Sequence, residues 1–233
     1  MQLIAHRHET PLYQESSLEN LLAGAKAKME AVECDLRRTA DGQYVIFHDP
    51  SILRLSGRDM KIAEYSLEAL NEAMEAAGRH IMTLEELKAG YHEEVPILLH
   101  VKLHETSKEL MEVLRTLPFP CIFGLEMPEM VQCARAFKPQ EEILAFMPQM
   151  EMYPEFIAAG TGIIRLWEQW VRADEELIRK VKAAGAPKVW IMSWNGHTMS
   201  GSEESLDTMH RLGADGVLLN DIPLALAWRE KNL

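Results

Sequence analysis

The stretch from Gly162 to Ser193 reads GIIRLWEQWVRADEELIRKVKAAGAPKVWIMS. Its two ends, Gly162–Leu166 and Lys188–Ser193, are short apolar runs that contain β-branched residues, and such runs predict buried strands. Between them, Asp174–Ala184 carries apolar residues at helical spacing and is followed by Gly185, a residue type that often ends a helix. A strand, a helix and a second strand in this order predict one unit of a parallel sheet with a crossover helix.

The same alternation runs along the whole chain. The runs predicted as principal strands are Gln2–His6, Ala31–Leu36, Ile97–Lys102, Pro120–Gly124, Ile143–Met147, Gly162–Leu166, Lys188–Ser193 and Asp215–Leu219. The segments predicted as helices between them are Leu18–Met29, Ser107–Leu117, Pro128–Phe137, Tyr153–Ala159, Asp174–Ala184, Glu203–Leu212 and Ile222–Glu230. Eight strands that alternate with helices predict a (β/α)8 barrel of the TIM-barrel type. An open doubly wound sheet is the alternative, but no GxGxxG motif follows the first strand.

One long segment between the second and third principal strands interrupts the alternation. It runs from Asp49 to Val95, which is far longer than a single crossover needs. Ser66–Ala76 and Thr83–Lys88 have helical patterns, and an additional strand-like run, Tyr44–His48, comes just before the segment. We therefore predict a single domain, residues 1–233, with an embedded insertion at about 50–95.

Composition narrows the class of protein. The chain has 233 residues, 24 Lys and Arg against 36 Asp and Glu, a formal net charge of −12, and 47% hydrophobic residues. The apolar content argues against disorder, and the acidic balance argues against general nucleic-acid binding. The three cysteines lack CxxC spacing, which predicts reduced thiols in a cytoplasmic protein. No signal-peptide core and no run of ~18 apolar residues is found, so we expect no membrane span, while the oligomeric state stays open.

Polar side chains gather where several predicted strands end, and in a parallel barrel this face carries the chemistry. His6 and Arg7 end the first strand, and His48 ends the additional run. Glu33 and Asp35 occupy alternate positions of the second strand, so both point to one face. Two neighbouring buried carboxylates need a cation, and their oxygen atoms suit Mg²⁺ or Ca²⁺.

The neighbouring residues suit an anionic substrate at that cation. Arg7 and Lys102, together with the metal ion, are placed to bind a phosphate, and Arg7 is able to donate two parallel hydrogen bonds. His6 and His48 can supply a general base and a general acid, because histidine titrates near neutral pH. The residues therefore indicate hydrolysis of a phosphoester.

Short motifs follow one another in the N-terminal part of the chain. They are His6-Arg7, Glu19-Asn20, Glu33-Cys34-Asp35, Thr39-Ala40-Asp41-Gly42 and His48-Asp49. In this order and at this spacing, the motifs resemble those of the glycerophosphodiester phosphodiesterase family. The resemblance continues to the C-terminus through Trp194-Asn195, Gly213–Val217 and Asn220–Pro223, and the long insertion matches one that the family carries. It covers essentially the whole chain.

The resemblance implies a (β/α)8 barrel that uses a divalent metal to hydrolyse glycerophosphodiesters to an alcohol and glycerol 3-phosphate. By position, His6 and His48 resemble the catalytic histidines of the family. Glu33 and Asp35 resemble two of its metal ligands.

The resemblance also implies how a small phosphodiester is bound. Arg7 resembles the phosphate-binding arginine of the family, and Lys102 resembles the lysine that ends its third strand. Trp194 resembles its aromatic residue after the seventh strand, and it either contacts the glycerol carbons or serves only in packing.

Two positions depart from the family pattern. His8 stands where the family has a glycine after His-Arg, which restricts the backbone turn close to the phosphate. On the third strand, His100-Val101-Lys102 replaces the E-x-K triplet whose glutamate is the third metal ligand. With His100 as a ligand, Mg²⁺ or Ca²⁺ would be held more weakly, and Mn²⁺, Co²⁺ or Zn²⁺ would also be accommodated. Alternatively, His100 is not a ligand and water or a substrate oxygen fills the position.

Other polar residues have simpler interpretations. Glu126, just past the fourth strand, could replace the missing carboxylate, but we favour a solvated loop residue. The histidines without a matching partner pattern are interpreted as surface or structural residues: His80, His92, His104, His197 and His210.

Two alternative functions remain at this point. The chain could be a catalytically impaired barrel that binds phosphorylated metabolites, because the ligand glutamate is missing. It could also act on another phosphodiester or a phospholipid, with Trp167 and Trp170 lining an apolar part of the barrel mouth. No basic amphipathic stretch marks a membrane-binding surface, so the phospholipid alternative ranks lower.

Overall fold

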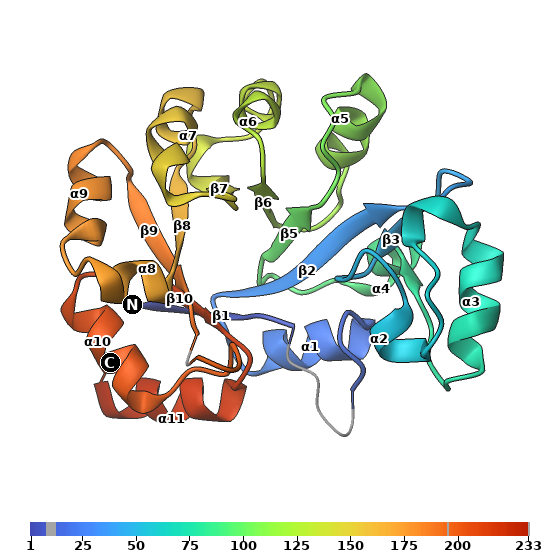
Figure 1. Cartoon of the computed structure of the whole chain (residues 1–233), viewed down its shortest axis with the longest axis horizontal. Helices are drawn as coiled ribbons and strands as arrows, with labels where there is room; N and C mark the ends of the chain where they lie inside the picture. The colour runs from blue at the N-terminus through green and yellow to red at the C-terminus, as the bar shows by residue number, and fades with distance from the viewer. Residues whose placement is uncertain (8–12, 195, 233) are drawn as a thin grey trace.

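The computed structural model of the chain describes residues 1–7, 13–194 and 196–232, and it contains a closed parallel barrel (Figure 1). The barrel strands are β1 (Gln2–Ala5), β2 (Ala31–Arg38), β5 (Ile97–Val101), β6 (Cys121–Leu125), β7 (Ile143–Ala145), β8 (Ile163–Trp167), β9 (Lys188–Met192) and β10 (Gly216–Leu219). They pair in the order β1-β10-β9-β8-β7-β6-β5-β2, and pairing of β1 with β2 closes the ring. The predicted (β/α)8 barrel is confirmed.

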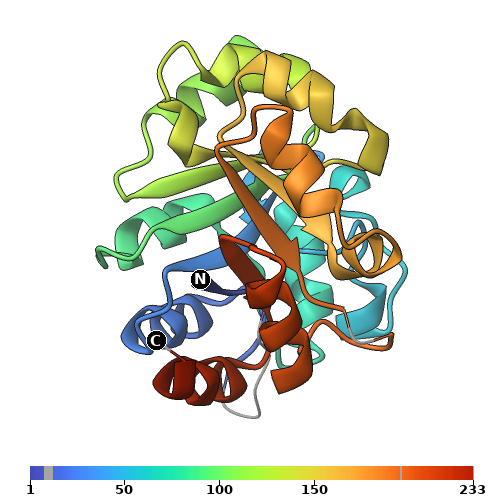
Figure 2. The ribbon, with the colours of Figure 1, turned by 90° about the vertical axis from the view of Figure 1, so that its left-hand side faces the viewer.

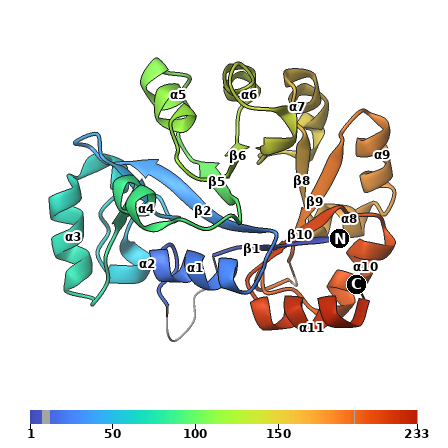
Figure 3. The ribbon, with the colours of Figure 1, turned by 180° about the vertical axis from the view of Figure 1, so that it is seen from behind.

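Helices cover the outside of the barrel, as three views of the ribbon show (Figures 1, 2 and 3). They are α1 (Leu18–Lys26), α5 (Lys108–Arg115), α6 (Pro128–Ala134), α7 (Tyr153–Ala159), α8 (Glu168–Ala173), α9 (Leu177–Ala183), α10 (Glu203–Arg211) and α11 (Ile222–Asn232). Short 3₁₀ turns precede β7 and α7, at Gln140–Glu142 and Met150–Met152. The predicted helices are present, mostly with shorter ends, and α8 is an additional helix directly after β8.

Capping serines fix where several of these helices begin. The side-chain oxygens of Ser17, Ser107 and Ser202 accept hydrogen bonds from backbone N–H groups in the first turns of α1, α5 and α10. Such caps satisfy N–H groups that lack a partner inside the helix. In α5, Leu110 and Leu114 are buried at helical spacing, so this face packs against the sheet.

Apolar side chains fill the interior of the barrel. They are Ile4, Ala31, Leu98, Ile122, Leu144, Phe146, Ile163, Trp190, Met192 and Leu218. A larger apolar layer lies between the strands and the surrounding helices. In a barrel of this type, the side chains that carry chemistry lie beyond this filling, at the C-terminal ends of the strands.

The segment between β2 and β5 forms a structure at one side of the barrel (Figures 1 and 3). Its elements are β3 (Tyr44–Ile46), α2 (Leu53–Ser56), a 3₁₀ turn (Ile62–Glu64), α3 (Leu67–Glu75), β4 (Met82–Thr83) and α4 (Leu84–Gly90). β3 pairs antiparallel with β2 and with β4, so the segment extends the sheet. It has an apolar core of its own, made of Val45, Phe47, Ile52, Ile62, Leu70, Ala73, Met74 and Ile81. Both helices predicted here are present.

Two further expectations can be compared with the described part of the chain. Cys34, Cys121 and Cys133 are all free thiols. Among the described residues, no helix combines the length and the apolar character that crossing a membrane requires.

Candidate active site

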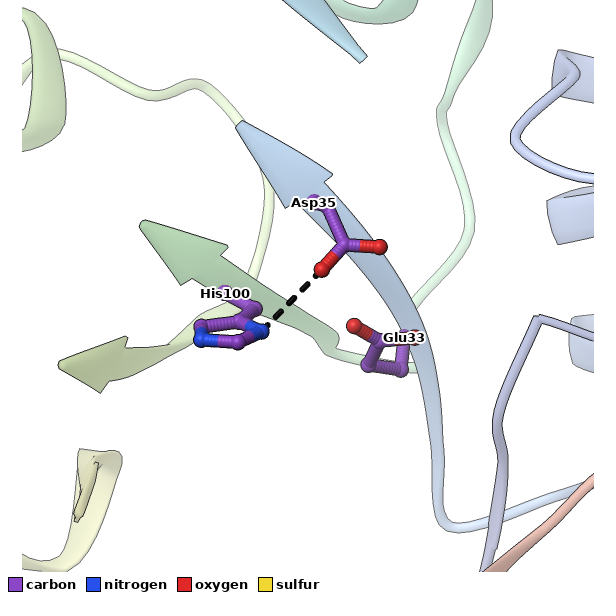
Figure 4. Close-up of side chains that lie close together, drawn as sticks. All are labelled: Glu33, Asp35 and His100. Carbon is purple, nitrogen blue, oxygen red and sulfur yellow. Dashed lines mark ion pairs between the residues drawn. The ribbon is translucent and has the colours of Figure 1, made fainter. Parts of the chain in front are cut away.

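β2 places two carboxylates inside the barrel, side by side (Figure 4). Glu33 and Asp35 alternate along this strand, and their exposed fractions are 3% and 0%. One carboxylate oxygen of Glu33, Oε2, and both of Asp35 are buried without a hydrogen-bond partner within the described residues. Burying carboxylate oxygens without partners costs free energy unless a cation binds to them.

The two carboxylates have opposite pKa shifts. Burial, followed by the charge of Asp35, raises the pKa of Glu33 well above its ordinary value. Burial would also raise the pKa of Asp35, but its interaction with His100 and the charge of Lys102 hold that pKa well below its ordinary value. The pair therefore resists carrying two negative charges unless a positive ion lies between them.

β5 places His100 directly beside Asp35, because these two residues are partners in the strand register. The Nδ1 atom of His100 lies 3.0 Å from Oδ1 of Asp35. Ligand atoms of Glu33, Asp35 and His100 all lie within 4.8 Å of one another, so the three side chains could hold one metal ion. The imidazole of His100 therefore lies where a third metal ligand would be needed beside Glu33 and Asp35.

The other side of the His100 ring contacts Glu126, which lies just after β6. Nε2 of His100 lies 2.7 Å from Oε1 of Glu126, and His104 contacts the second carboxylate oxygen. Although burial raises the pKa of Glu126, these two histidines lower it to about 2. The interpretation of Glu126 as a solvated loop residue is wrong, since its carboxylate is part of the His100 environment.

His6 lies at the end of β1 and faces Glu33. Its Nδ1 atom lies 2.7 Å from Oδ1 of Asn220, and its Nε2 atom lies 3.8 Å from Oε2 of Glu33. Burial, followed by the charge of Arg7, lowers the pKa of His6 to about 3. The ring is therefore neutral at neutral pH, and the contact with Asn220 assigns the proton to Nδ1 and leaves Nε2 able to accept one.

His48 lies just after β3. Its Nδ1 atom lies 2.6 Å from Oδ1 of Asp49, whose other oxygen accepts a hydrogen bond from Arg54. Arg54 also pairs with the buried Glu15. Burial lowers the pKa of His48 to about 4. The imidazole is thus oriented by a carboxylate that is itself held in place.

Two cations reach the same region. Nζ of Lys102 lies 3.0 Å from Oδ1 of Asp35 and 3.0 Å from the carbonyl oxygen of His48. Arg7 adopts a backbone φ of 30°, in the left-handed region, and its Nε donates a 3.4 Å hydrogen bond to Nε2 of His6. Backbone strain of this kind often occurs where a side chain is positioned for function.

Most of these groups line one pocket of about 340 Å³, but Glu33 is not among its lining residues. The predicted site residues that line it are His6, Arg7, Asp35, His48, His100 and Lys102. Trp194 borders a neighbouring hollow, which it shares with Arg7 and His48. Two positions singled out in the sequence, His8 and Asn195, lie outside the described residues.

One residue of the pocket was not found from the sequence. Arg165 lies on β8, is 4% exposed and lines the same pocket as Asp35. The available signal was a charged residue in the middle of an apolar strand, flanked by Ile163 and Trp167 on the same face.

The fold and the pocket define a TIM-barrel protein that gathers carboxylates, imidazoles and cations at one end of its strands. The chain belongs to the Glycerophosphoryl diester phosphodiesterase family, whose sequence pattern matches residues 6–212. A curated relative, YhdW of Bacillus subtilis (strain 168), is 25% identical over 119 residues, which are 48% of this chain and 49% of the relative. The match therefore spans about half the length of that relative.

Solved structures share the fold over nearly the whole chain. A glycerophosphodiester phosphodiesterase from Thermotoga maritima superposes with a TM-score of 0.76 at 20% identity, covering 97% of this chain and 96% of its own. An Oleispira antarctica phosphodiesterase, in complex with the product sn-glycerol-3-phosphate, superposes with a TM-score of 0.73 at 20% identity, covering 99% and 97%.

Proposed function

We propose that this protein hydrolyses glycerophosphodiesters to an alcohol and glycerol 3-phosphate with the help of a divalent metal ion. The observation that carries the proposal is the set of buried carboxylate oxygens on Glu33 and Asp35, of which Oε2 of Glu33 and Oδ2 of Asp35 have no hydrogen-bond partner among the described residues, beside His6, Lys102 and His100. Membership of the family and the product named with the Oleispira antarctica structure support the same reaction.

Glu33, Asp35 and His100 are the residues that would hold the metal ion. The carboxylate oxygens of Glu33 and Asp35 are hard ligands, and the Nδ1 atom of His100 is a ligand of intermediate hardness. We expect Mg²⁺ or Ca²⁺ at this set, with Mn²⁺, Co²⁺ or Zn²⁺ accommodated because of the imidazole. A bound ion would supply positive charge next to a phosphate oxygen and so favour attack at phosphorus.

Arg7 and Lys102 would bind the remaining phosphate oxygens. Both side chains are largely buried, and Arg7 lies beside His6 while Lys102 lies beside Asp35. Cations that are withdrawn from water interact strongly with a phosphate and neutralise its charge as it changes during the reaction. Trp194, in the neighbouring hollow, would cover the glycerol carbons.

We assign the general base to His6 and the general acid to His48. Nδ1 of His6 faces the neutral amide of Asn220, which fixes the tautomer and leaves Nε2 available to accept a proton. Nδ1 of His48 faces the carboxylate of Asp49, which stabilises a protonated ring. A bound phosphate would favour protonation of His48 further, so this ring can donate a proton to the leaving alkoxide.

We also propose that the chain forms a single domain in which the insertion is embedded. Arg37 and Arg38 of β2 are register partners of Val45 and Tyr44 of β3, so the insertion shares a hydrogen-bonded sheet with the barrel. Thermal unfolding followed by two spectroscopic signals would test this proposal. A single shared transition is expected, and two separate transitions would contradict it.

The proposed reaction is tested by stripping the protein of metal with a chelator and adding back each divalent ion. Release of glycerol 3-phosphate from sn-glycero-3-phosphocholine, -ethanolamine, -serine and -glycerol is then measured. We expect activity to depend on added metal and on Asp35, so that Asp35→Asn loses it. Phosphate-ester binding without turnover of any substrate would instead indicate a catalytically impaired barrel, and turnover of phospholipid alone would indicate a different substrate class.

A further inference from the structure

Arg165 occupies the strand that lies across the barrel from the two carboxylates. Three strands separate β8 from β2 in either direction around the ring, namely β7, β6 and β5 on one side and β9, β10 and β1 on the other. Arg165 lines the same pocket as Asp35, His6 and His48. A ligand that spans this pocket would therefore contact both the proposed metal site and Arg165.

The guanidinium of Arg165 forms no ion pair within 4.0 Å in the part of the chain that the structure describes, although the charge of Glu126, which lines the same pocket, acts on it. The residue is 4% exposed, and its Nε and Nη1 atoms are buried without a hydrogen-bond acceptor among those residues. Burial lowers the pKa of Arg165 to about 10, so the group still carries its charge at neutral pH. An unpaired buried charge is costly, and one that lines a pocket is best explained by an anion supplied by the ligand.

Three aromatic rings hold this cation in place. The guanidinium carbon of Arg165 lies 4.7 Å from the ring centroid of Trp167, 5.1 Å from that of Phe146 and 6.0 Å from that of Trp170. Aromatic groups of this kind can bind a quaternary ammonium ligand such as choline. Here the protein's own cation already occupies these rings, so this end of the pocket repels a second cation.

The aromatic group is directly connected to the proposed metal site. The ring of Phe146 stacks on the ring of His100, with centroids 3.8 Å apart and planes 17° from parallel. One face of the pocket therefore runs from Asp35 through His100 and Phe146 to Arg165. A phosphodiester whose phosphate lies at the cluster would extend one of its two halves along this face.

We propose that Arg165 binds a negatively charged group, a carboxylate or a phosphate, on the alcohol half of the phosphodiester. The protein then selects substrates with an acidic alcohol half over those whose alcohol half is only cationic. The proposal rests on the proposed function, because it assigns the alcohol half of the same substrate.

The test compares two substrates that differ by one carboxylate, sn-glycero-3-phosphoserine and sn-glycero-3-phosphoethanolamine. We expect wild-type kcat/KM to be at least about 10-fold higher for the serine compound, as expected for one charge-assisted hydrogen-bonded pair. Arg165→Met, which keeps an apolar side chain between the rings, should bring the ratio close to one, and Arg165→Lys should retain part of it. Arg179→Gln on the surface of α9, where the side chain is 73% exposed, should leave the ratio unchanged.

Two results would overturn the proposal. An equal loss of kcat/KM for both substrates in Arg165→Met would mean that Arg165 binds the phosphate they share, and an unchanged ratio would mean that it contacts neither. Circular dichroism checks that Arg165→Met is folded. If Arg165→Met does not fold, Arg165→Lys provides the test. Its ratio of kcat/KM for the two substrates should then fall between that of the wild type and one.

A binding measurement separates this proposal from the proposed function. Calorimetry with O-phospho-L-serine and with O-phosphoethanolamine should show tighter binding of the serine compound by wild-type protein and a smaller difference in Arg165→Met. Failure of the wild-type protein to hydrolyse any glycerophosphodiester would contradict the proposed function alone. Equal binding of the two compounds by wild-type protein would contradict the role of Arg165.

Discussion

Nε2 of His100 lies 2.7 Å from Oε1 of Glu126, and this contact determines which ring nitrogen faces the carboxylates of β2. A carboxylate accepts hydrogen bonds, so Nε2 donates to Glu126, and Nδ1 is the nitrogen whose lone pair would face a bound metal ion. Nδ1 is the atom that lies 3.0 Å from Asp35. Histidine ligands of metals are commonly held in this way by a carboxylate behind the ring.

Replacing Glu126 with alanine should therefore weaken metal binding by roughly 10- to 100-fold, because the His100 ring loses the group that fixes its tautomer and orientation. Glu126→Gln should lose less metal affinity, since its amide oxygen can still accept a hydrogen bond from Nε2 of His100. Isothermal titration with Mn²⁺ measures both variants, with Glu129→Gln on the exposed side of α6 as the control. Unchanged affinity in Glu126→Ala would exclude this supporting role.

Replacing His100 with glutamate should tighten Mg²⁺ and Ca²⁺ binding by about 10-fold and reduce the preference for Zn²⁺, because carboxylate oxygen is the harder ligand. The new carboxylate would face Glu126, so the double variant with Glu126→Gln removes the repulsion and serves as the matched comparison. Metal affinities that stay the same in both variants would show that position 100 does not contact the ion.

His6→Ala and His48→Ala should each lower kcat by about 100-fold or more if the two rings transfer protons. A substrate with a p-nitrophenol leaving group needs little help from an acid, so it should rescue His48→Ala and leave His6→Ala slow. The exposed His92, replaced by alanine, is the control. Turnover at the wild-type rate in both site variants would contradict the acid–base assignment. If the p-nitrophenol substrate restored the turnover of His6→Ala and not that of His48→Ala, the two roles would be exchanged.

The insertion offers a test of pH dependence. Thr83 and Glu86 form a capping box at the start of α4, with the Thr83 backbone N–H 2.6 Å from Oε2 of Glu86. Although burial raises it, hydrogen bonds with Thr83 lower the pKa of Glu86 below its ordinary value of 4.5. A lowered pKa contributes stability above the ordinary value, and this contribution disappears as the pH falls through and below 4.5.

Glu86→Gln should accordingly be less stable than wild type by up to about 1 kcal/mol at pH 7, and the difference should shrink toward pH 3. Urea unfolding at a series of pH values measures it. A difference that grows on acidification would contradict the sign of the shift. Glu85→Gln, one position away and 79% exposed, is the control.

The barrel itself could be predicted from the sequence because its signals are local. Each strand is a short apolar run, each crossover has helical spacing, and several crossovers also carry a capping residue or a terminating glycine. The inward direction of Glu33 and Asp35 also follows from alternation along one strand. These predictions do not depend on which strands become neighbours in the sheet.

The parts that could not be predicted depend on contacts between strands. His100 is the register partner of Gly124, and a Cβ at Gly124 would come within 2.4 Å of Phe146, so glycine leaves the room in which that ring stacks on His100. Glu126 follows two residues later and so reaches the same imidazole. Nothing in the sequence near Glu126 indicates this partner, which is 26 positions away. Arg165 is similar, because its pocket contains side chains from several separate strands.

The carbonyl oxygen of His48 accepts hydrogen bonds from Nε and Nη2 of Arg37 and from Nζ of Lys102, at 3.0, 2.8 and 3.0 Å. All three donors belong to residues of the barrel or its edge, and the acceptor is main chain. The main chain of His48 is therefore held from the barrel side, and its ring is oriented through Asp49 and Arg54 at the start of the insertion, so side chains beyond Arg54 have little influence on it. Helices α3 and α4 can accumulate substitutions or exchange for other segments, as long as they still pack, without displacing His48, the proposed proton donor that precedes them in the chain.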